Sequence, residues 1–319
     1  MRTLPILLDV DTGVDDALAL IFAITHPSLD VRAITCVAGN APLAQVVENT
    51  LRILDAADAP PIPVAAGAVR PLLSPGRAAS HVHGEDGLGG LVLPETSRVP
   101  ESVSAVELMR RTLAESDEPL TLVALAPQTN LALLLRTHPE VVDKIERIVF
   151  MGGSASVGNA TALAEFNVWH DPEAAAIVLG SGIPIFMYGL DVFNQVTVAQ
   201  DAAASLATGG SPLGVVVGAL LGNRVALSED SSLVYTGLIG DAGALCALVE
   251  PESLRVERRP VRVELAGYGR GQTVVDRRRY SGEDVIYGGV GDWSVIEVAL
   301  DVDAPRYAAL FLETLGLDG

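Results

Sequence analysis

The chain has 319 residues, 49% of them hydrophobic, which is enough for one large globular domain with a substantial core. A formal net charge of −19 argues against nucleic acid or an anionic membrane as a partner. No apolar stretch reaches the roughly 18 residues that span a membrane. Cys36 and Cys246 lie in apolar segments and the N-terminus lacks a secretory cleavage pattern, so we expect reduced core thiols in a cytoplasmic protein.

Short β-branched or leucine-rich runs alternate with longer helical patterns through most of the chain. The expected strands are Pro5–Asp9, Val31–Ala38, Leu120–Ala124, Arg147–Met151 and Pro184–Tyr188. Helical patterns lie between them, at 15–26, 42–57, 102–116, 128–137 and 171–180. This alternation predicts an open α/β fold, with a mostly parallel sheet, right-handed crossovers and helices on both faces.

The C-terminal part is less regular. It predicts strands at Arg255–Leu265, Gln272–Asp276 and Val295–Val302, followed by a helix from Pro305 to Leu315. No repeat, low-complexity tract or long linker interrupts the chain, so we predict a single domain over residues 1–319.

Small and polar residues follow each of the five earlier strands. Ligands of open α/β sheets bind beyond the carboxyl ends of the strands, so these residues predict one coherent site along that edge. The segments that follow the strands are the aspartates of 9–16, Gly39-Asn40, Ala126–Asn130, Gly152-Gly153 and Gly189–Asp191.

The richest of these segments holds four aspartates in eight residues, Asp9, Asp11, Asp15 and Asp16. Packing so many like charges together costs free energy unless a cation neutralises them. A helix N-cap would explain only one of the four. Oxygen ligands without a neighbouring Cys or His suit Ca²⁺ or Mg²⁺ better than zinc, so the segment predicts half of a metal site.

Two other motifs compete for this segment. An EF-hand loop fits poorly, because its turn glycine falls on Val14 and its final glutamate on Leu20. The haloacid-dehalogenase phosphatase motif, Asp-x-Asp-x-Thr, is imitated to within a residue by Asp9-Val-Asp11-Thr12, and Lys144 and Asp241 would have to supply its remaining charges. That alternative predicts phosphate release from phosphate esters and no free reducing sugar.

A second polar segment decides between these interpretations. It runs Met151-Gly-Gly-Ser-Ala-Ser-Val-Gly-Asn159 and continues as Ala164-Glu-Phe-Asn-Val-Trp-His-Asp-Pro-Glu173. The aspartate segment precedes it, and so do Ala38-Gly-Asn40, His83-Gly-Glu-Asp-Gly-Leu88 and Pro127-Gln-Thr-Asn130; Asp241 follows. In this order and spacing, over nearly the full length, the chain resembles the inosine–uridine-preferring nucleoside hydrolase family.

The resemblance implies a nucleoside hydrolase-like α/β fold with a Rossmann-like core, and hydrolysis of the N-glycosidic bond of ribonucleosides around a bound Ca²⁺. By position, Asp11, Asp16 and Asp241 match the metal-binding carboxylates, and the backbone carbonyl of Leu125 matches a main-chain ligand. Asp11 also matches the general base for the attacking water. His83 matches a histidine near the sugar and base. The residues that match the ribose-binding side chains are Asp15, Asn40, Asn159, Glu165 and Asn167.

These residue types suit the chemistry that the resemblance implies. Departure of the base leaves an oxocarbenium-like ribose, whose positive charge is favoured by carboxylates and amide oxygens placed in advance. A vicinal diol can complete an oxygen-ligated calcium shell and so fix the ribose. Calcium acidifies water only weakly compared with zinc, so a carboxylate base is needed as well.

The chain departs from the family pattern just before the late aspartate. In the best-studied branch of the family a histidine at that position protonates the departing base, and here the residue is Gly240. Glycine has no side-chain proton to donate, so another group must activate the leaving base. The stretch from Asn223 to Tyr235 would lie beside the base in this family; the donors that we consider are His83, Arg224, Tyr235 and a protonated Asp230.

Three other residues receive structural interpretations. We assign Trp169 to core packing, Asp171 to a helix start with a proline at the first position, and Asp191 to structural hydrogen bonding.

The sequence thus predicts a calcium-dependent ribonucleoside hydrolase that releases ribose and a free nucleobase and forms a homodimer or homotetramer. Its expected partner is a small nucleoside, with neither nucleic acid nor membrane. One alternative is a hydrolase of a modified or biosynthetic nucleoside, suggested by Gly240. Another is a catalytically idle protein that binds calcium and ribose, which the retained Asp11 argues against.

Overall fold

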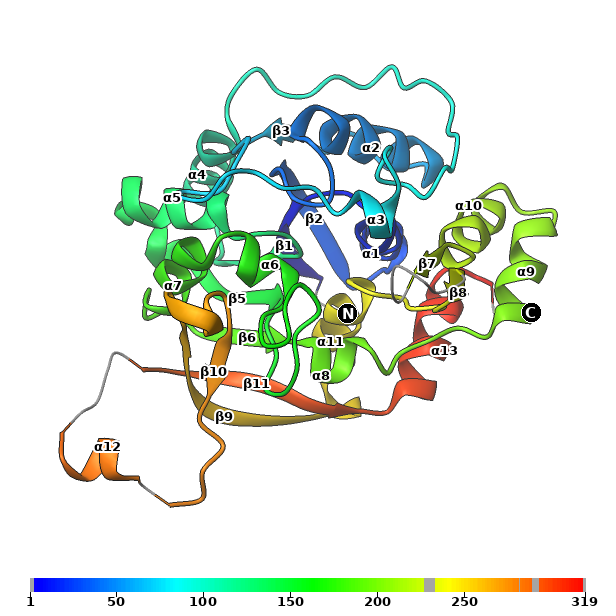
Figure 1. The fold of residues 1–319 in the computed structure, drawn as a ribbon. Coiled ribbons are helices and arrows are strands. Elements are labelled where there is room, and N and C mark those ends of the chain that lie inside the picture. Colours follow the sequence, from blue (N-terminus) through cyan, green and yellow to red (C-terminus); the bar gives the residue numbers. More distant parts are fainter. Residues whose placement is uncertain (1–2, 227–232, 281, 289–292, 318–319) are drawn as a thin grey trace.

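A nine-stranded sheet lies at the centre of the molecule (Figure 1). The computed structural model describes residues 3–226, 233–280, 282–288 and 293–317. The strand order is β10-β9-β11-β6-β5-β4-β1-β2-β3, and only β9 runs antiparallel to its neighbours among the described strands of this sheet. Its strands are β1 (Leu4–Val10), β2 (Leu29–Cys36), β3 (Val64–Ala66), β4 (Leu120–Ala124), β5 (Ile145–Met151), β6 (Ile185–Tyr188), β9 (Leu254–Val263), β10 (Thr273–Val275) and β11 (Ser294–Val302).

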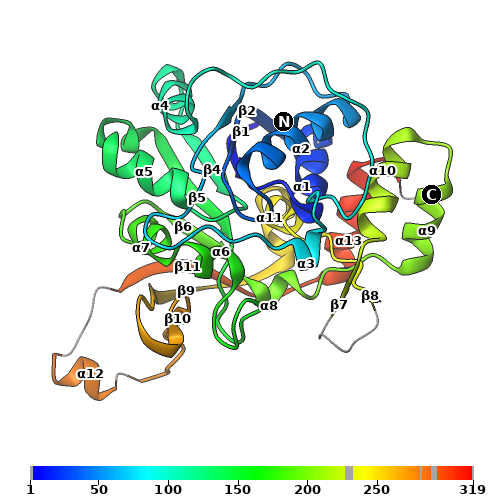
Figure 2. The same ribbon diagram turned by 45° about the horizontal axis from the view of Figure 1, so that its top comes forward.

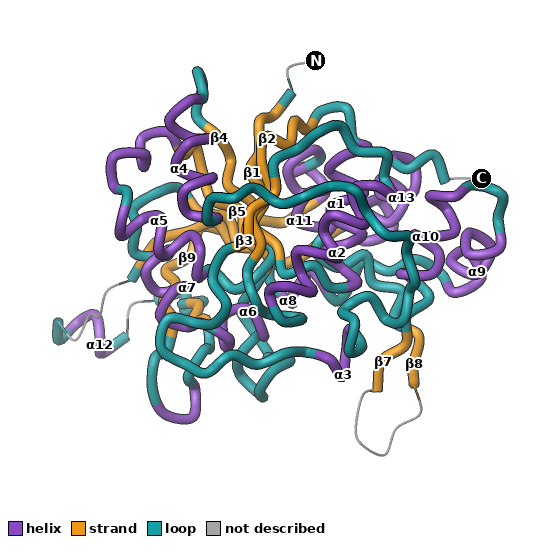
Figure 3. The backbone as a smooth tube through the Cα atoms, turned by 90° about the horizontal axis from the view of Figure 1, so that it is seen from above, coloured by secondary structure: helices purple, strands orange, loops and turns teal. Residues whose placement is uncertain are grey.

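Helices cover both faces of the sheet, and Figure 3 shows the two layers edge-on on either side of the strands. Side chains of β1 alternate between the layers, because Ile6 and Leu8 pack into one apolar cluster and Leu7 into the other. One layer contains α1 (Val14–Thr25), α2 (Leu43–Ala56), α10 (Pro212–Leu221), α11 (Ala242–Val249) and α13 (Ala304–Thr314). The other contains α4 (Ala105–Glu115), α5 (Thr129–Thr137) and α7 (Pro172–Leu179).

Shorter elements lie around these layers. A two-stranded antiparallel hairpin packs beside α3, as Figure 2 shows. In Figures 1 and 2 the segment that carries α12 projects away from the sheet. These elements are α3 (Ser80–His83), α6 (Phe166–His170), α8 (Leu190–Phe193), α9 (Gln200–Thr208), α12 (Glu283–Ile286), β7 (Arg224–Ala226), β8 (Leu233–Tyr235) and the 3₁₀ turns Pro139–Lys144, Pro251–Ser253 and Gly267–Gly269.

The predicted strands and helices are confirmed to within a few residues at each end. Sequence patterns did not reveal β3, the β7–β8 hairpin, α9, α11 or the short helices α3, α6, α8 and α12. The α11 segment is short and apolar on every side, so its sequence has no helical period to detect. Cys36 and Cys246 are buried as expected. No helix in the described ranges is long and apolar enough to cross a bilayer.

The strand order creates a crevice between β1 and β4. From β1 the order runs outward to β2 and β3 on one side, and from β4 to β5 and β6 on the other. The segment after β1 enters α1 in one helix layer, whereas the segment after β4 enters α5 in the opposite layer. The two connections therefore diverge at the carboxyl ends of the strands, where open α/β sheets bind their ligands.

Candidate active site

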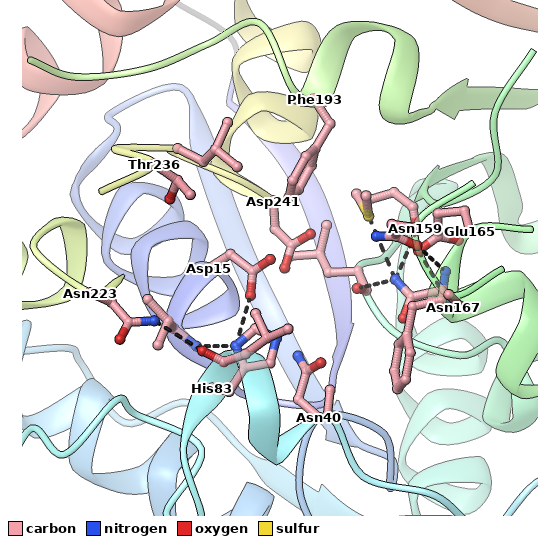
Figure 4. A pocket seen from close by; sticks show the side chains of 18 of the residues that line it. Asp15, Asn40, His83, Asn159, Glu165, Asn167, Phe193, Asn223, Thr236 and Asp241 are labelled. Carbon is pink, nitrogen blue, oxygen red and sulfur yellow. Dashed lines mark hydrogen bonds and ion pairs between the residues drawn. The ribbon is translucent and has the colours of Figure 1, made fainter. Parts of the chain in front are cut away.

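A cavity of about 540 Å³ opens at this crevice (Figure 4). This volume is within the usual range for a small-molecule site. Residues that follow β1, β2 and β4 line it, among them Asp15, Asn40 and Leu125, and Met151 at the end of β5 lines it too. Asp241, just before α11, joins them from the C-terminal half of the chain.

Three carboxylates meet beside this cavity. Oxygens of Asp15, Asp16 and Asp241 lie within 4.8 Å of one another, and Asp16 and Asp241 are buried. The buried Asp11 is joined to this cluster, because its backbone N–H donates to Asp16 Oδ1 at 3.2 Å. The fourth aspartate of the sequence motif, Asp9, is held elsewhere by Thr35 and Asn130.

Asn40 links two of the aspartates. Its Nδ2 donates to Asp11 Oδ1 at 3.1 Å and to Asp16 Oδ2 at 2.9 Å, and its backbone N–H donates to Asp11 Oδ2 at 2.8 Å. Gly13 makes this close packing possible, since a Cβ at Gly13 would lie 2.7 Å from both Asn40 Nδ2 and His83 Nδ1. The aspartates are thus fixed in place before any ligand binds.

Burial and mutual repulsion raise the pKa values of the clustered carboxyls. For Asp16 the pKa rises to about 7, first through burial and then through Asp15. For Asp11 and Asp241 the pKa rises well above the usual range, with burial as the largest cause and neighbouring aspartates adding to it. Such a cluster remains ionised at neutral pH only if a nearby positive charge compensates it.

The donor set fits a hard divalent cation. Every candidate ligand atom in the cluster is a carboxylate oxygen, with no sulfur or imidazole nitrogen among Asp15, Asp16 and Asp241. The Leu125 carbonyl, at the adjoining end of β4, accepts a hydrogen bond from Asn167 Nδ2 at 2.9 Å and has a second lone pair available. Asp15, which the resemblance placed at the ribose, therefore lies in the same cluster as the expected metal ligands.

A second polar group forms the opposite side of the cavity in Figure 4. Glu165 caps α6, with Oε1 accepting from Asn167 N–H and Oε2 from the N–H groups of Gly153 and Val168. Burial raises the pKa of Glu165 to about 7. Asn159 Oδ1 accepts from a backbone N–H at 2.9 Å, and its Nδ2 donates to no acceptor among the described residues, so that amino group can donate to a ligand.

Asn167 fastens this group to the sheet. Its Nδ2 donates to the carbonyls of Leu125 at 2.9 Å and Met151 at 3.2 Å, so one amide joins the ends of β4 and β5. Its Oδ1 accepts no hydrogen bond from the described part of the chain. Asn159, Glu165 and Asn167 all line the cavity, which the sequence prediction required of them.

His83 is the imidazole nearest the acidic cluster. It is buried at the end of α3, and its Nδ1 lies 3.7 Å from Asp15 Oδ1. The Val14 N–H donates to the same Nδ1 at 3.2 Å, so the ring proton is on Nε2. Burial lowers the pKa of His83, which keeps the ring neutral with Nε2–H as a donor.

Of the other residues considered as proton donors to the leaving base, none is described with its side chain in the cavity. The Tyr235 hydroxyl donates to the Val198 carbonyl at 2.6 Å, and Tyr235 is not among the described cavity-lining residues. Arg224 begins β7, where its backbone pairs with Tyr235, but its side chain lies outside the described part of the structure. Asp230 lies outside the described residues altogether.

The backbone at Gly240 excludes a side chain. Its φ is +57°, and a Cβ there would lie 2.3 Å from Asp15 Cβ. The position that carries a proton-donating histidine in the best-studied branch is therefore closed in this chain, and Asp15 occupies the space beside it.

The assignment of Trp169 to core packing was wrong. Trp169 is only partly buried and lines the cavity, with the Arg77 guanidinium carbon 4.2 Å from its ring centroid. Asn223 lines the cavity, as expected for the stretch beside the base, and so does Phe166 of the quoted motif, to which no role was assigned. Sequence analysis overlooked four further lining residues, which belong to no recognisable motif: Arg77, Phe193, Asn194 and Thr236. Asp171 caps α7 and Asp191 accepts a backbone hydrogen bond from Ala155, as predicted.

A mostly parallel α/β sheet with a buried carboxylate cluster beside an amide-lined cavity is typical of an enzyme that binds small polar ligands. The family model described as inosine-uridine preferring nucleoside hydrolase matches residues 6–309, and the chain belongs to this family. It is therefore an N-glycosidase of the ribonucleoside hydrolase class. Family membership removes the phosphatase alternative, and the enzymatic activity of the relatives argues against an idle binding protein.

Named relatives extend over nearly the whole chain. This chain is 43% identical over 314 residues to the pyrimidine-specific ribonucleoside hydrolase RihA of Escherichia fergusonii. The aligned residues cover 98% of each sequence. Among solved structures, it is similar to the plant nucleoside hydrolase PpNRh1, with a TM-score of 0.88, 30% identity and coverage of 98% of this chain and 99% of that one. The purine-preferring ribonucleoside hydrolase from Gardnerella vaginalis gives a TM-score of 0.86, 29% identity and the same coverage.

Proposed function

We propose that the protein hydrolyses pyrimidine ribonucleosides in a calcium-dependent reaction. The observation that carries the proposal is the buried carboxylate cluster of Asp11, Asp16 and Asp241 opposite the amide-lined wall of the cavity. A cation and a ribose would satisfy both sides at once. The preference for pyrimidines is supported by the relatives named as pyrimidine-specific, at 43% identity over 98% of the chain.

Calcium would be held by Asp11, Asp16, Asp241 and the Leu125 carbonyl, with Asp15 close enough to share the cluster. Bound there, it would neutralise the carboxylates and fix the vicinal diol of the ribose. On the opposite side, the free Nδ2 of Asn159 and Oδ1 of Asn167 are a donor and an acceptor for the remaining sugar hydroxyl.

Asp11 is the proposed general base. Burial and the Asp16 charge raise its pKa, and a carboxylate with a raised pKa is a better acceptor for the proton of the attacking water. Both Asp11 oxygens accept hydrogen bonds from Asn40, which holds the carboxylate in one orientation. The water oxygen bonds to C1′, the C1′–N bond breaks with its electron pair on the base, and the base takes up a proton.

His83 is the proposed source of that proton. Its Nδ1 accepts from Val14, so Nε2–H is the proton-bearing atom, and the ring lines the cavity on the side opposite Asn159 (Figure 4). Gly240 supplies no donor, and the Tyr235 hydroxyl is already engaged with the Val198 carbonyl. Replacement of a general acid typically lowers the rate 10²- to 10⁴-fold, so we expect His83→Gln to lower kcat by roughly this factor. The loss should be smallest for nucleosides whose base is a good leaving group, because such a base departs without being protonated.

The test measures reducing sugar released from uridine, cytidine, inosine and adenosine, with EGTA and after calcium is restored. We expect release from the pyrimidine nucleosides that EGTA abolishes and calcium restores. Calcium binding followed by titration calorimetry adds a readout without turnover. Asp241→Asn should weaken that binding, whereas Asp143→Asn, on an exposed 3₁₀ turn away from the cavity, should not.

Two results would contradict the proposal. Sugar release unaffected by EGTA would remove calcium from it, and a purine preference would remove the pyrimidine assignment. If calcium binds but none of these four nucleosides is cleaved, the modified-nucleoside alternative becomes the better one, because Gly240 changes the leaving-group side.

We also propose that residues 1–319 form one domain and assemble as a homodimer or homotetramer. The one-domain proposal is supported by a single sheet that includes both β1 and β11. Analytical ultracentrifugation of the full chain would measure its mass against the 33.2 kDa of one subunit.

A further inference from the structure

A threonine from the C-terminal part of the chain fastens the base of the loop that follows β5. This loop, residues 152–165, joins β5 to α6 and carries Asn159 and Glu165 of the cavity wall; we call it the wall loop. Thr273 begins β10, the edge strand of the nine-stranded sheet, and is buried. Its Oγ1 accepts a hydrogen bond from the Ser154 N–H and donates one to the Ser154 carbonyl, each at 2.8 Å.

The hydroxyl of Thr273 takes the place of a neighbouring strand for this part of the loop. The N–H and carbonyl of Ser154, itself buried, make no other hydrogen bond among the described residues. Buried backbone groups that lose their partners are costly, so the single hydroxyl satisfies two such groups at once. The base of the wall loop therefore depends on one side chain that lies 119 residues further along the chain.

Gly153 allows the close approach of Thr273. A Cβ at Gly153 would lie 2.7 Å from Thr273 Cγ2 and 2.8 Å from its Oγ1, and the φ of Gly153 is +68°. The Gly153 N–H in turn donates to Glu165 Oε2 at 2.8 Å. The residue that packs on Thr273 thus also fixes the carboxylate of Glu165, and a shift of the loop base would move that carboxylate.

The same region of the sheet edge supports α6. Gly271, just before β10, has φ +87°, and a Cβ there would lie 2.6 Å from Trp169 Cα. A separate contact comes from Asp191, whose Oδ2 accepts from the Ala155 N–H at 2.7 Å. The wall loop and α6, which together form the amide-bearing side of the cavity in Figure 4, are therefore braced from outside the cavity.

We propose that Thr273 is a positioning residue for the wall that faces the ribose, and here the inference rests on the proposed function. Its hydroxyl holds the base of the wall loop, so that Glu165 and Asn159 meet the sugar in a fixed orientation. Misplacement of a bound substrate by about 1 Å costs on the order of 100-fold in rate, so this orientation matters for attack on C1′. Thr273 acts through the loop, since it is not among the described residues that line the cavity.

The experiment compares kcat/KM for uridine in the wild type, Thr273→Val and Thr273→Ser. Valine keeps the shape of threonine without the hydroxyl, and serine keeps the hydroxyl without the methyl group that packs on Gly153. We expect Thr273→Val to lower kcat/KM roughly 10- to 100-fold, because the unpaired groups of Ser154 displace the loop. Thr273→Ser should retain the activity of the wild type.

Calcium binding, measured by calorimetry, distinguishes a displaced wall from a general loss of structure. The carboxylate cluster lies on the other side of the cavity from the wall, so its affinity for calcium should not change in Thr273→Val. Thr112→Val is the matched control, because the Thr112 hydroxyl donates to the Leu108 carbonyl within α4, away from the cavity. We expect this control to leave both activity and calcium binding unchanged.

Amide hydrogen exchange of the wall loop measures its positioning without turnover. Peptides from residues 152–165 should exchange faster in Thr273→Val than in the wild type, Thr273→Ser and Thr112→Val. Thr273→Ala, which also lacks the hydroxyl and leaves space beside Ser154, replaces the valine variant in every measurement if circular dichroism shows that the latter is unfolded.

Three results would overturn the proposal: unchanged exchange of the wall loop in Thr273→Val, the same loss of activity in Thr273→Ser, or a parallel loss of calcium binding. Undiminished kcat/KM for uridine in Thr273→Val would overturn it as well. If the wild type cleaves none of the four nucleosides, the proposed function fails and amide exchange alone decides. Faster exchange confined to the hydroxyl-free variants would then still support the positioning of this wall by Thr273.

Discussion

Gly240→Ala is the substitution for which the structure predicts the sharpest consequence. Gly240 has φ +57°, a conformation that costs an alanine about 1 kcal/mol. Its new Cβ would also lie 2.3 Å from Asp15 Cβ, so the backbone or Asp15 must move. Overpacking of this kind costs about 1–3 kcal/mol. The expected loss in free energy of unfolding is therefore about 2–4 kcal/mol.

Gly182→Ala isolates the two contributions. Gly182 has φ +79° but nothing within 4 Å of a built Cβ, so only the backbone strain of about 1 kcal/mol applies. Urea unfolding of both variants and the wild type gives the difference between them directly, and we expect it to be about 1–3 kcal/mol.

Activity provides a second measurement on the same variants. Displacement of Asp15 by a fraction of an ångström to an ångström should lower kcat/KM for a nucleoside roughly 10- to 100-fold in Gly240→Ala, and Gly182→Ala should leave it unchanged. Equal stability and equal activity in the two variants would refute the close packing of Gly240 against Asp15. The same packing predicts that Gly240→His cannot restore a histidine donor.

Two further substitutions test buried groups. Burial raises the pKa of Asp9 from 3.8 to about 7, so its neutral form is favoured in the fold, and its stabilising contribution is lost as pH rises from about 4 to about 7. Asp9→Asn removes this titration, and the amide oxygen can still accept from Thr35 and Asn130. Measured by urea unfolding, the free energy of unfolding of the variant minus that of the wild type should increase by up to ~4 kcal/mol over that pH range. If the two free energies change with pH in parallel, the buried Asp9 charge does not destabilise the fold. Tyr235→Phe removes the hydrogen bond to the Val198 carbonyl and should cost about 1 kcal/mol in urea unfolding while kcat stays within about twofold. A much larger fall in kcat would place the hydroxyl in the chemistry.

The sheet and its ligand-binding edge could be predicted from sequence because their signals are local. The run from Leu4 to Leu8 is apolar throughout, and a helix N-cap would explain only one of the four aspartates in the segment that follows it. Which aspartates converge was not predictable in this way. Asp9 and Asp11 are two residues apart, yet Asp9 bonds to Thr35 and Asn130, whereas Asp11 bonds to Asn40.

Residues contributed by irregular segments could not be placed. Arg77 lies in a long connection without periodicity, so nothing in the sequence indicated that it would stack on Trp169 of α6. Trp169 itself follows an apolar position and reads as a core residue. Only the three-dimensional path of the segment between β3 and α3 reveals that both line the cavity.

The two hydrogen bonds that Asn167 Nδ2 donates to the strand ends have a consequence for how nucleoside hydrolases diverge. One amide joins the Leu125 and Met151 carbonyls at the ends of adjacent strands, so the wall proposed to face the sugar is anchored directly to the sheet. His83, by contrast, lies on α3 in a connecting segment, and Asn223 lies between α10 and β7. Under the proposed function, exchange of the connecting segments would alter the nucleobase side while the ribose side is inherited unchanged. Relatives named for purine and for pyrimidine nucleosides would then differ in their loops and share a single sugar-recognising framework.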